Sequence, residues 1–181
     1  NPGTVGSPFL TLGHALTVIV SGDNISIAAG TYSDDDITFP AVDNITITGA
    51  GIGSTIFDGD GDASSAQRFM TISGSVTGLT ISDMTIQDMD VNGTGAGFNI
   101  TTSGSVTLQD IKFYVCQTIT GSDVDGGGVY VSSSSTAIID RCIFQGNKIP
   151  NTSNSDGSAI ANVGGIATIQ NCLFYDNNCQ T

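Results

Sequence analysis

The sequence lacks the residues on which several functions depend. Its 181 residues include no tryptophan, one histidine and only 4 lysines or arginines against 17 acidic residues, which gives a net charge of −13. So acidic a chain would be repelled by phosphate backbones and anionic membranes, and we expect no nucleic-acid partner. No run of about 18 apolar residues is present, so we expect no spanning helix and no direct membrane insertion. The one histidine, His14, lies far from any serine–carboxylate pair, and no catalytic triad is apparent.

Charged residues make up only 12% of the chain, about half of the usual fraction of roughly 25%. Glycine, serine, threonine and asparagine take their place, and these residues favour turns and short strands over helices. Hydrophobic residues make up 39%, which is enough for a continuous core. The acidic composition suits a secreted or cell-surface protein, and the opening at Asn1 without a signal segment suggests a mature form or an excised fragment.

The four cysteines follow no zinc-binding pattern, because their spacings of 26, 30 and 7 residues and the single histidine fit no known ligand set. Cys142 and Cys172 occupy equivalent positions of a repeat described below. We therefore expect their side chains to point inward and to stack on neighbouring coils. A disulfide involving Cys116 or Cys179 stays open.

The C-terminal half repeats itself with a step of about 31 residues. A glycine-rich element begins at residues 95, 126 and 157, and a second element occupies residues 108–113, 139–144 and 169–174. Self-similarity at a fixed period of a few tens of residues predicts a solenoid. We expect equivalent apolar side chains to form interior ladders: Phe113, Phe144 and Phe174 in one column, and Leu108, Ile139 and Ile169 in another.

The rest of the chain alternates apolar and polar residues in runs of about three to six, bounded by Gly, Asp, Asn or Ser, which predicts an all-β fold. A β-sandwich is the main rival, but the regular spacing of the repeat favours a parallel β-helix. One position in each copy breaks the alternation and predicts a bend, and it is held by Asp83, Asp110, Arg141 and Asn171.

Near the N-terminus the spacing changes to that of an amphipathic helix over residues 8–19, with Ser7 as its cap and Pro8 in its first turn. Such a helix would close the open end of a solenoid core. We therefore expect one domain over residues 1–181, made of a cap (1–23), irregular coils (24–94) and repeat coils (95–181), and we expect it to be a segment of a longer protein.

Two repeated motifs resemble a known family. Gly126-Gly127-Gly128-Val129 and Gly157-Ser158-Ala159-Ile160 resemble the GGA(I/L/V) element of polymorphic outer membrane protein repeats, and Phe144-Gln145-Gly146-Asn147 and Phe174-Tyr175-Asp176-Asn177 resemble its FxxN element. Cys116 departs from the second element, since it replaces the asparagine. The N-terminal segment is similar to the cap of secreted pectin-lyase-like β-helices. The resemblance implies a right-handed parallel β-helix, with a short capping α-helix, that serves as a surface-displayed passenger or stalk, often in adhesion.

Asp58, Asp60 and Asp62 have the alternating spacing of a calcium-binding loop, whose ligands are carboxylate oxygens. Position twelve is Phe69 rather than glutamate, which excludes an EF-hand. An irregular calcium turn is a hypothesis here, residues 34–36 are a second candidate, and an ordinary polar turn is the alternative for both. We expect no other cofactor.

Five N-x-S/T sequons would accept glycans if the source is eukaryotic: Asn24, Asn44, Asn92, Asn99 and Asn151. Four tyrosines are candidate platforms for carbohydrate, and two of them, Tyr114 and Tyr175, hold the same repeat position and are expected to point outward. The alternative for an outward tyrosine is a plain surface residue.

The favoured interpretation is a noncatalytic structural or adhesive module of an extracellular assembly. We expect self-association or neighbouring coils at an open C-terminal end, and glycans or a host surface as further partners. The alternative is a polysaccharide-binding or polysaccharide-cleaving lyase or hydrolase, so enzymatic activity stays open. No catalytic residues are assigned, because the few bases are scattered and the nearest candidate pair, Asp110 and Arg141, is expected to form a salt bridge across coils.

Overall fold

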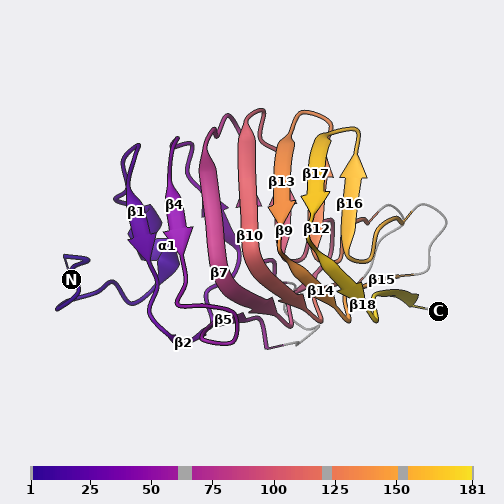
Figure 1. Ribbon diagram of the computed structural model, residues 1–181, viewed down its shortest axis with the longest axis horizontal. Helices are drawn as coiled ribbons and strands as arrows, with labels where there is room; N and C mark the ends of the chain where they lie inside the picture. Colours follow the sequence, from indigo (N-terminus) through magenta and orange to yellow (C-terminus); the bar gives the residue numbers. More distant parts are fainter. Residues whose placement is uncertain (1, 61–66, 120–123, 151–154, 181) are drawn as a thin grey trace.

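The computed structural model describes residues 2–60, 67–119, 124–150 and 155–180. Almost all of its elements are short strands that pair in parallel and wind the chain into a β-solenoid (Figure 1). The two termini lie at opposite ends of the solenoid. The predicted all-β parallel β-helix is therefore confirmed, and the sandwich is excluded.

Within the described residues the strands form three sheets, which are the walls of the solenoid. The main path of a 10-stranded sheet contains β1 (Asn24–Ser26), β4 (Thr46–Thr48), β7 (Leu79–Gln87), β10 (Ser105–Tyr114), β13 (Thr136–Asp140) and β17 (Ile166–Gln170). Its remaining strands are β2 (Gly30–Tyr32), β5 (Thr55–Asp58), β14 (Ile143–Gln145) and β18 (Leu173–Tyr175). A 5-stranded sheet contains β3 (Ile37–Phe39), β6 (Met70–Ile72), β9 (Phe98–Ile100), β12 (Val129–Ser132) and β16 (Ile160–Val163). A 4-stranded sheet contains β8 (Asp90–Val91), β11 (Gln117–Thr118), β15 (Lys148–Pro150) and β19 (Asn178–Gln180).

The strand register identifies the sequence repeat with one coil of the solenoid. Leu108 pairs with Ile139, and Ile139 pairs with Ile169, in the repeat positions predicted from the sequence. In the N-terminal half the same inward column continues through Ile81, Ile47 and Ile25, but the coils have unequal lengths because their loops differ.

An aromatic ladder runs along the interior. The rings of Phe113 and Phe144 stack with centroids 4.7 Å apart and planes 7° apart, and those of Phe144 and Phe174 stack at 5.0 Å and 5°. These separations equal the distance between neighbouring strands, which shows that the ladder follows the coil pitch. In strand register the ladder continues toward the N-terminus through Ile86 and Phe57. The rings of Phe98, from the 5-stranded sheet, and Phe69 complete a series of ring contacts from Phe113 to Phe57, at 4.7–5.9 Å.

The coils turn at residues with left-handed backbone conformation. The predicted bend is confirmed, since Asp83, Asp110, Arg141 and Asn171 have φ values of 61°, 52°, 52° and 55°. A second corner contains Asp88, Val115, Gly146 and Asp176, and a third contains the first glycine of each glycine-rich element: Gly95, Gly126 and Gly157. A Cβ on Gly126 would lie 2.3 Å from the Val129 carbonyl oxygen, which explains why the motif begins with glycine.

The predicted helix of residues 8–19 is wrong in its extent and its cap. Helix α1 spans only Leu12–Leu16, and its cap is Thr11, whose hydroxyl accepts a hydrogen bond from the backbone N–H of His14 at 3.1 Å. Ser7 instead closes a tight turn, with its N–H bonded to the Thr4 carbonyl. Within the described residues, no helix is long and apolar enough to cross a lipid bilayer.

Candidate functional site

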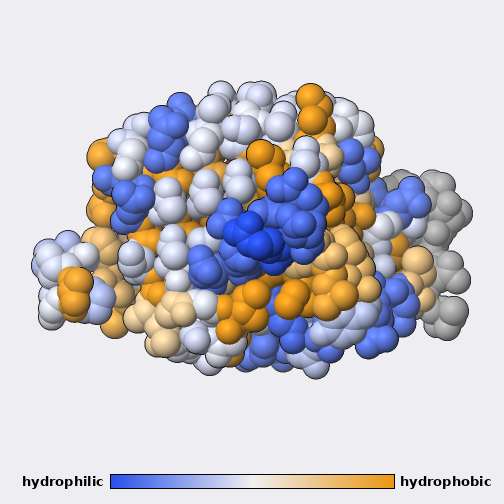
Figure 2. Space-filling model, viewed as in Figure 1, coloured by the Kyte–Doolittle hydropathy of each residue, from blue (hydrophilic) through white to orange (hydrophobic). Residues whose placement is uncertain are grey.

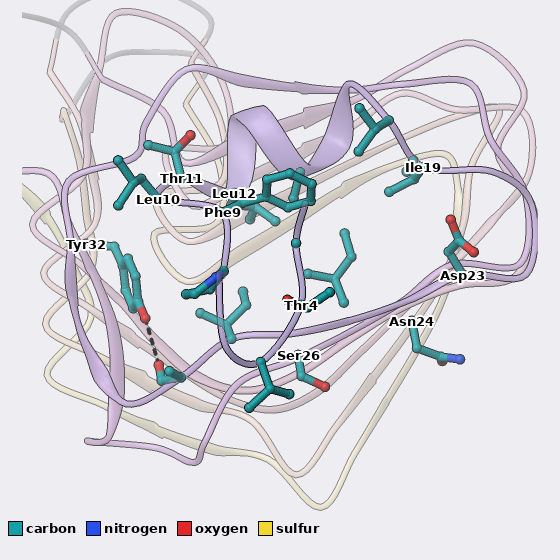
Figure 3. Close-up of a pocket in the computed structure, with 18 of the residues that line it drawn as sticks. Thr4, Phe9, Leu10, Thr11, Leu12, Ile19, Asp23, Asn24, Ser26 and Tyr32 are labelled. Carbon is teal, nitrogen blue, oxygen red and sulfur yellow. Dashed lines mark hydrogen bonds between the residues drawn. The ribbon is translucent and has the colours of Figure 1, made fainter. Parts of the chain in front are cut away.

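A cavity of about 640 Å³ lies between the N-terminal segment and the first coil (Figure 3). Its walls are mainly apolar and include Phe9, Leu12 and Ile19. Two polar side chains at its rim form hydrogen bonds within the chain: the Tyr32 hydroxyl donates to the Ala28 carbonyl at 2.9 Å, and the Asp23 carboxylate accepts the Val20 N–H at 2.8 Å. The cavity is therefore the space left where the N-terminal cap packs against the first coil.

A charged cluster crosses three coils at the first corner of the large sheet. The guanidinium of Arg141 donates to both carboxylate oxygens of Asp110, at 2.9 and 2.7 Å, and also to Asp140. The Asn171 amide donates to Asp140 from the next coil at 2.8 Å. Figure 2 shows a strongly hydrophilic patch here, near the middle of the face, with hydrophobic residues beside it.

The predicted pair between Asp110 and Arg141 is thus confirmed. The hydrogen bond from Arg141 holds the pKa of Asp110 below its ordinary value. Since the guanidinium donates to two carboxylates at once, its role is to hold successive corners together. It does not resemble a base facing a substrate.

Two further basic residues make contacts outside this cluster. The Arg68 guanidinium donates to the carbonyls of Thr94 and Gly95, at 2.8–3.2 Å, and burial lowers its pKa. Lys112 lies with its ammonium 4.5 Å from the ring centroid of Tyr114. Each side chain therefore braces a loop or a neighbouring ring.

The two candidate calcium turns lie close to each other. One carboxylate oxygen of Asp58 accepts the Asp60 N–H at 3.1 Å, and the other accepts the Gln87 amide at 2.8 Å. Burial raises the pKa of Asp35, and so do the neighbouring carboxylates of residues 34, 36 and 60. Burial, Asp58 and Asp90 likewise raise the pKa of Asp88.

No three acidic, histidine or cysteine side chains among the described residues are arranged to hold a metal ion. Asp62, the third residue of the predicted calcium turn, lies outside the described residues. The calcium turn therefore stays a prediction.

A column of alternating amides and rings runs along the outer face of the large sheet. Gln87 pairs with Tyr114, Tyr114 with Gln145, and Gln145 with Tyr175, one residue per coil; we call these four residues the Gln–Tyr column. Tyr175 is exposed, and its hydroxyl donates to the side-chain amide oxygen of Gln145 at 2.6 Å. Tyr114 is half-buried beside Lys112. The shared position of the two tyrosines was predicted, whereas the glutamines between them were missed. Their place directly after the ladder residues Ile86 and Phe144 was the available signal.

The last described coil leaves the core ladders open. Ile139 and Phe144 are fully buried, but their successors Ile169 and Phe174 are 44% and 45% exposed. Strands β16, β17, β18 and β19 are each the last member of their row, so their outer edges pair with no described strand.

The cysteines lie on neighbouring coils, as predicted for Cys142 and Cys172. The Cys142 N–H points at the Cys172 sulfur at 3.4 Å, which confirms the predicted stacking, and all four cysteines are free thiols. Burial raises the pKa of Cys116 and of Cys142 to about 12, so both thiols stay protonated at neutral pH and are unreactive.

The predicted glycosylation sequons differ in exposure. Asn24, Asn44 and Asn92 are exposed, Asn99 is half-buried in β9, and Asn151 lies outside the described residues.

A family model described as "Protein of unknown function (DUF1565)" matches residues 1–179. No curated protein matches the chain. No solved structure matches it either. The resemblance to polymorphic outer membrane protein repeats stays a prediction.

Proposed function

Because this chain belongs to the DUF1565 family, whose function is unknown, we propose a role from its surfaces: a noncatalytic β-helix module of a secreted or cell-surface protein. The module would serve as a structural and adhesive element of an extracellular assembly. The last described coil would be its assembly surface, and a second copy of the chain would be the partner where no neighbouring coils of a longer protein cover this end.

The exposed end of the core carries this proposal. Ile169 and Phe174 continue two columns that are completely buried one coil earlier. Burying apolar surface is worth about 25 cal/mol per Å², and open strand edges add hydrogen-bonding groups that seek a partner. A second copy offers the same coil with the same pitch, and a two-fold dimer is the commonest closed arrangement.

The engagement of the charged side chains also supports a noncatalytic role. Arg141 is paired with two carboxylates, and Arg68 with two backbone carbonyls, so both cations stabilise the coil corners and loops. A polysaccharide-binding role is kept as a second candidate, because the Gln–Tyr column favours binding over cleavage.

The assembly is tested by sedimentation velocity over a concentration series. We expect the wild-type chain to dimerise and Ile169→Glu to stay monomeric, since the carboxylate would be buried in the interface. Leu173→Glu is the matched control, because Leu173 lies on the outward column of the same coil and is 54% exposed. A wild-type monomer at every concentration, or equal loss of dimer in both variants, would overturn the proposal. Far-UV circular dichroism checks that each variant is folded.

A further inference from the structure

We propose that the Gln–Tyr column binds a neutral, extended polysaccharide whose chain lies parallel to the solenoid axis. This inference deepens the adhesive part of the proposed function by naming its ligand class. The four residues stand at one register position of four successive coils, so they form a straight row. Tyr114 and Tyr175 are separated by two coils, which is roughly 10 Å at the strand spacing of a parallel sheet.

The order of the side chains matches a linear sugar polymer. A sugar unit with its glycosidic bond advances an extended chain by about one coil pitch. In a two-fold β-1,4-linked chain every second ring presents the same face, and the tyrosines also recur at every second coil. Each tyrosine would stack on the C–H face of a sugar, while Gln87 and Gln145 would bond the hydroxyls of the rings between, since an amide both donates and accepts.

Both rings are already held in place. The Tyr175 hydroxyl donates to the side-chain amide oxygen of Gln145 at 2.6 Å, which restrains both side chains. The Lys112 ammonium lies over one face of the Tyr114 ring, 4.5 Å from its centroid, and restrains that ring, so a sugar would stack on the opposite face. Platforms that are ordered before binding lose little side-chain entropy on binding, and this raises affinity.

The charge of the chain selects a neutral ligand. With a net charge of −13, the protein repels a polyuronate at low ionic strength. The four residues of the column are uncharged. Asp88 and Asp176 directly follow Gln87 and Tyr175, and Asp58 accepts the Gln87 amide, so the nearby acidic groups add to the repulsion of an anionic ligand. A peptide that binds by adding a strand would instead need a free strand edge. Three of the strands that carry the column, β7, β10 and β14, are paired on both sides, and only the edge of β18 pairs with no further described strand.

The test is isothermal calorimetry with three probes: the β-1,4-linked hexasaccharides of glucose and of xylose, and hexagalacturonate as the anionic comparison. We expect saturable binding of at least one neutral hexasaccharide and none of hexagalacturonate. Tyr114→Ala and Tyr175→Ala should each weaken binding at least about fivefold, the loss typical of a truncated aromatic anchor. The matched control is Tyr130→Ala, because Tyr130 points outward from the 5-stranded sheet and is half-buried like Tyr114, and its removal should change nothing.

Repeating the titrations in the Ile169→Glu background separates this inference from the assembly. Binding by that variant would support the column whether or not the chain dimerises. No binding of either neutral probe at millimolar concentration would overturn the inference. Equal losses in Tyr130→Ala and Tyr114→Ala, or binding only of hexagalacturonate, would overturn it as well. Thermal unfolding confirms that the variants are folded.

Discussion

Asn147 shows how a single buried residue links three coils. Its side-chain oxygen accepts the Cys116 N–H at 3.0 Å, and its amide nitrogen donates to the Phe113 carbonyl at 3.2 Å. From the next coil, the side-chain oxygen of Asn177 accepts hydrogen bonds from the side-chain amide and from the backbone N–H of Asn147. The asparagine that recurs in the Phe-x-x-Asn motif therefore replaces missing backbone hydrogen bonds at a corner.

We predict that Asn147→Leu lowers the free energy of unfolding by about 3 kcal/mol, because buried polar groups on two coils lose their partner. Urea denaturation measures the loss. Asn177→Leu is the control and should cost clearly less, since Asn177 is half-buried at the end of the stack. A change below about 0.5 kcal/mol in Asn147→Leu, the usual range of surface substitutions, would contradict this role.

The pair between Asp110 and Arg141 predicts a pH dependence. Because the pKa of Asp110 is lowered in the folded state, its contribution to stability is complete above the ordinary value of 3.8 and is lost as pH falls through the folded pKa. Asp110→Asn should therefore flatten the loss of stability as the pH falls below about 4. Denaturation midpoints measured across this range test it, and identical slopes for wild type and variant would contradict it. The effect is small because the pair is solvent-exposed.

At the scale of the element, one corner residue adopts a strained backbone conformation that glycine would adopt without strain. Val115 has φ = 55° although it is β-branched, while the same corner of the next coil is Gly146, with φ = 67°. We predict that Val115→Gly stabilises the protein by about 1 kcal/mol, since the left-handed conformation costs roughly 1–2 kcal/mol for a residue with a Cβ. Thermal unfolding should show a higher midpoint, and Gly146→Ala should lower it. A lower midpoint for Val115→Gly would contradict this explanation.

The strands were easier to predict than the cap. Phe113, Phe144 and Phe174 recur at equivalent positions because each coil must fill the same cross-section, so the sequence repeat reports the register directly. Helix α1 was overpredicted because Phe9 has helical spacing to Leu12, yet the Thr11 hydroxyl starts the helix later. The N-terminal coils differ in length, so no period could align them.

The surface sites were less predictable for a physical reason. A position facing outward is restricted by its neighbours on adjacent coils, and those are 27–31 residues away in the chain. The outward place of Tyr114 and Tyr175 followed from the repeat. The alternation with Gln87 and Gln145, and the proximity of Asp35 to Asp60, required the fold.

At the scale of the whole molecule, the charge of −13 opposes compaction. Asp35 and Asp88 have raised pKa values, so their carboxylates cost stability as pH rises above the ordinary value and through the folded pKa. A divalent cation at the acidic turns would offset this cost. We predict that millimolar calcium raises the unfolding midpoint more than sodium at equal ionic strength, and that Asp58→Asn removes the difference. Equal midpoints in both salts would contradict the calcium turn.

The two ends of the solenoid differ in how well the apolar core is covered. At the N-terminal end, α1 packs Leu12 and Leu16 against the core, whereas at the other end Ile169 and Phe174 remain open. If a second copy of the chain covers this end, stability must depend on protein concentration.

Amide hydrogen exchange at several protein concentrations measures this coverage directly. If two copies pair through the C-terminal coil, amides of β17 and β18 should exchange more slowly as concentration rises, while those of β10 and β13 should keep constant rates. The change should vanish in Ile169→Glu and persist in Leu173→Glu. Exchange rates in β17 and β18 that do not depend on concentration would contradict assembly through this end.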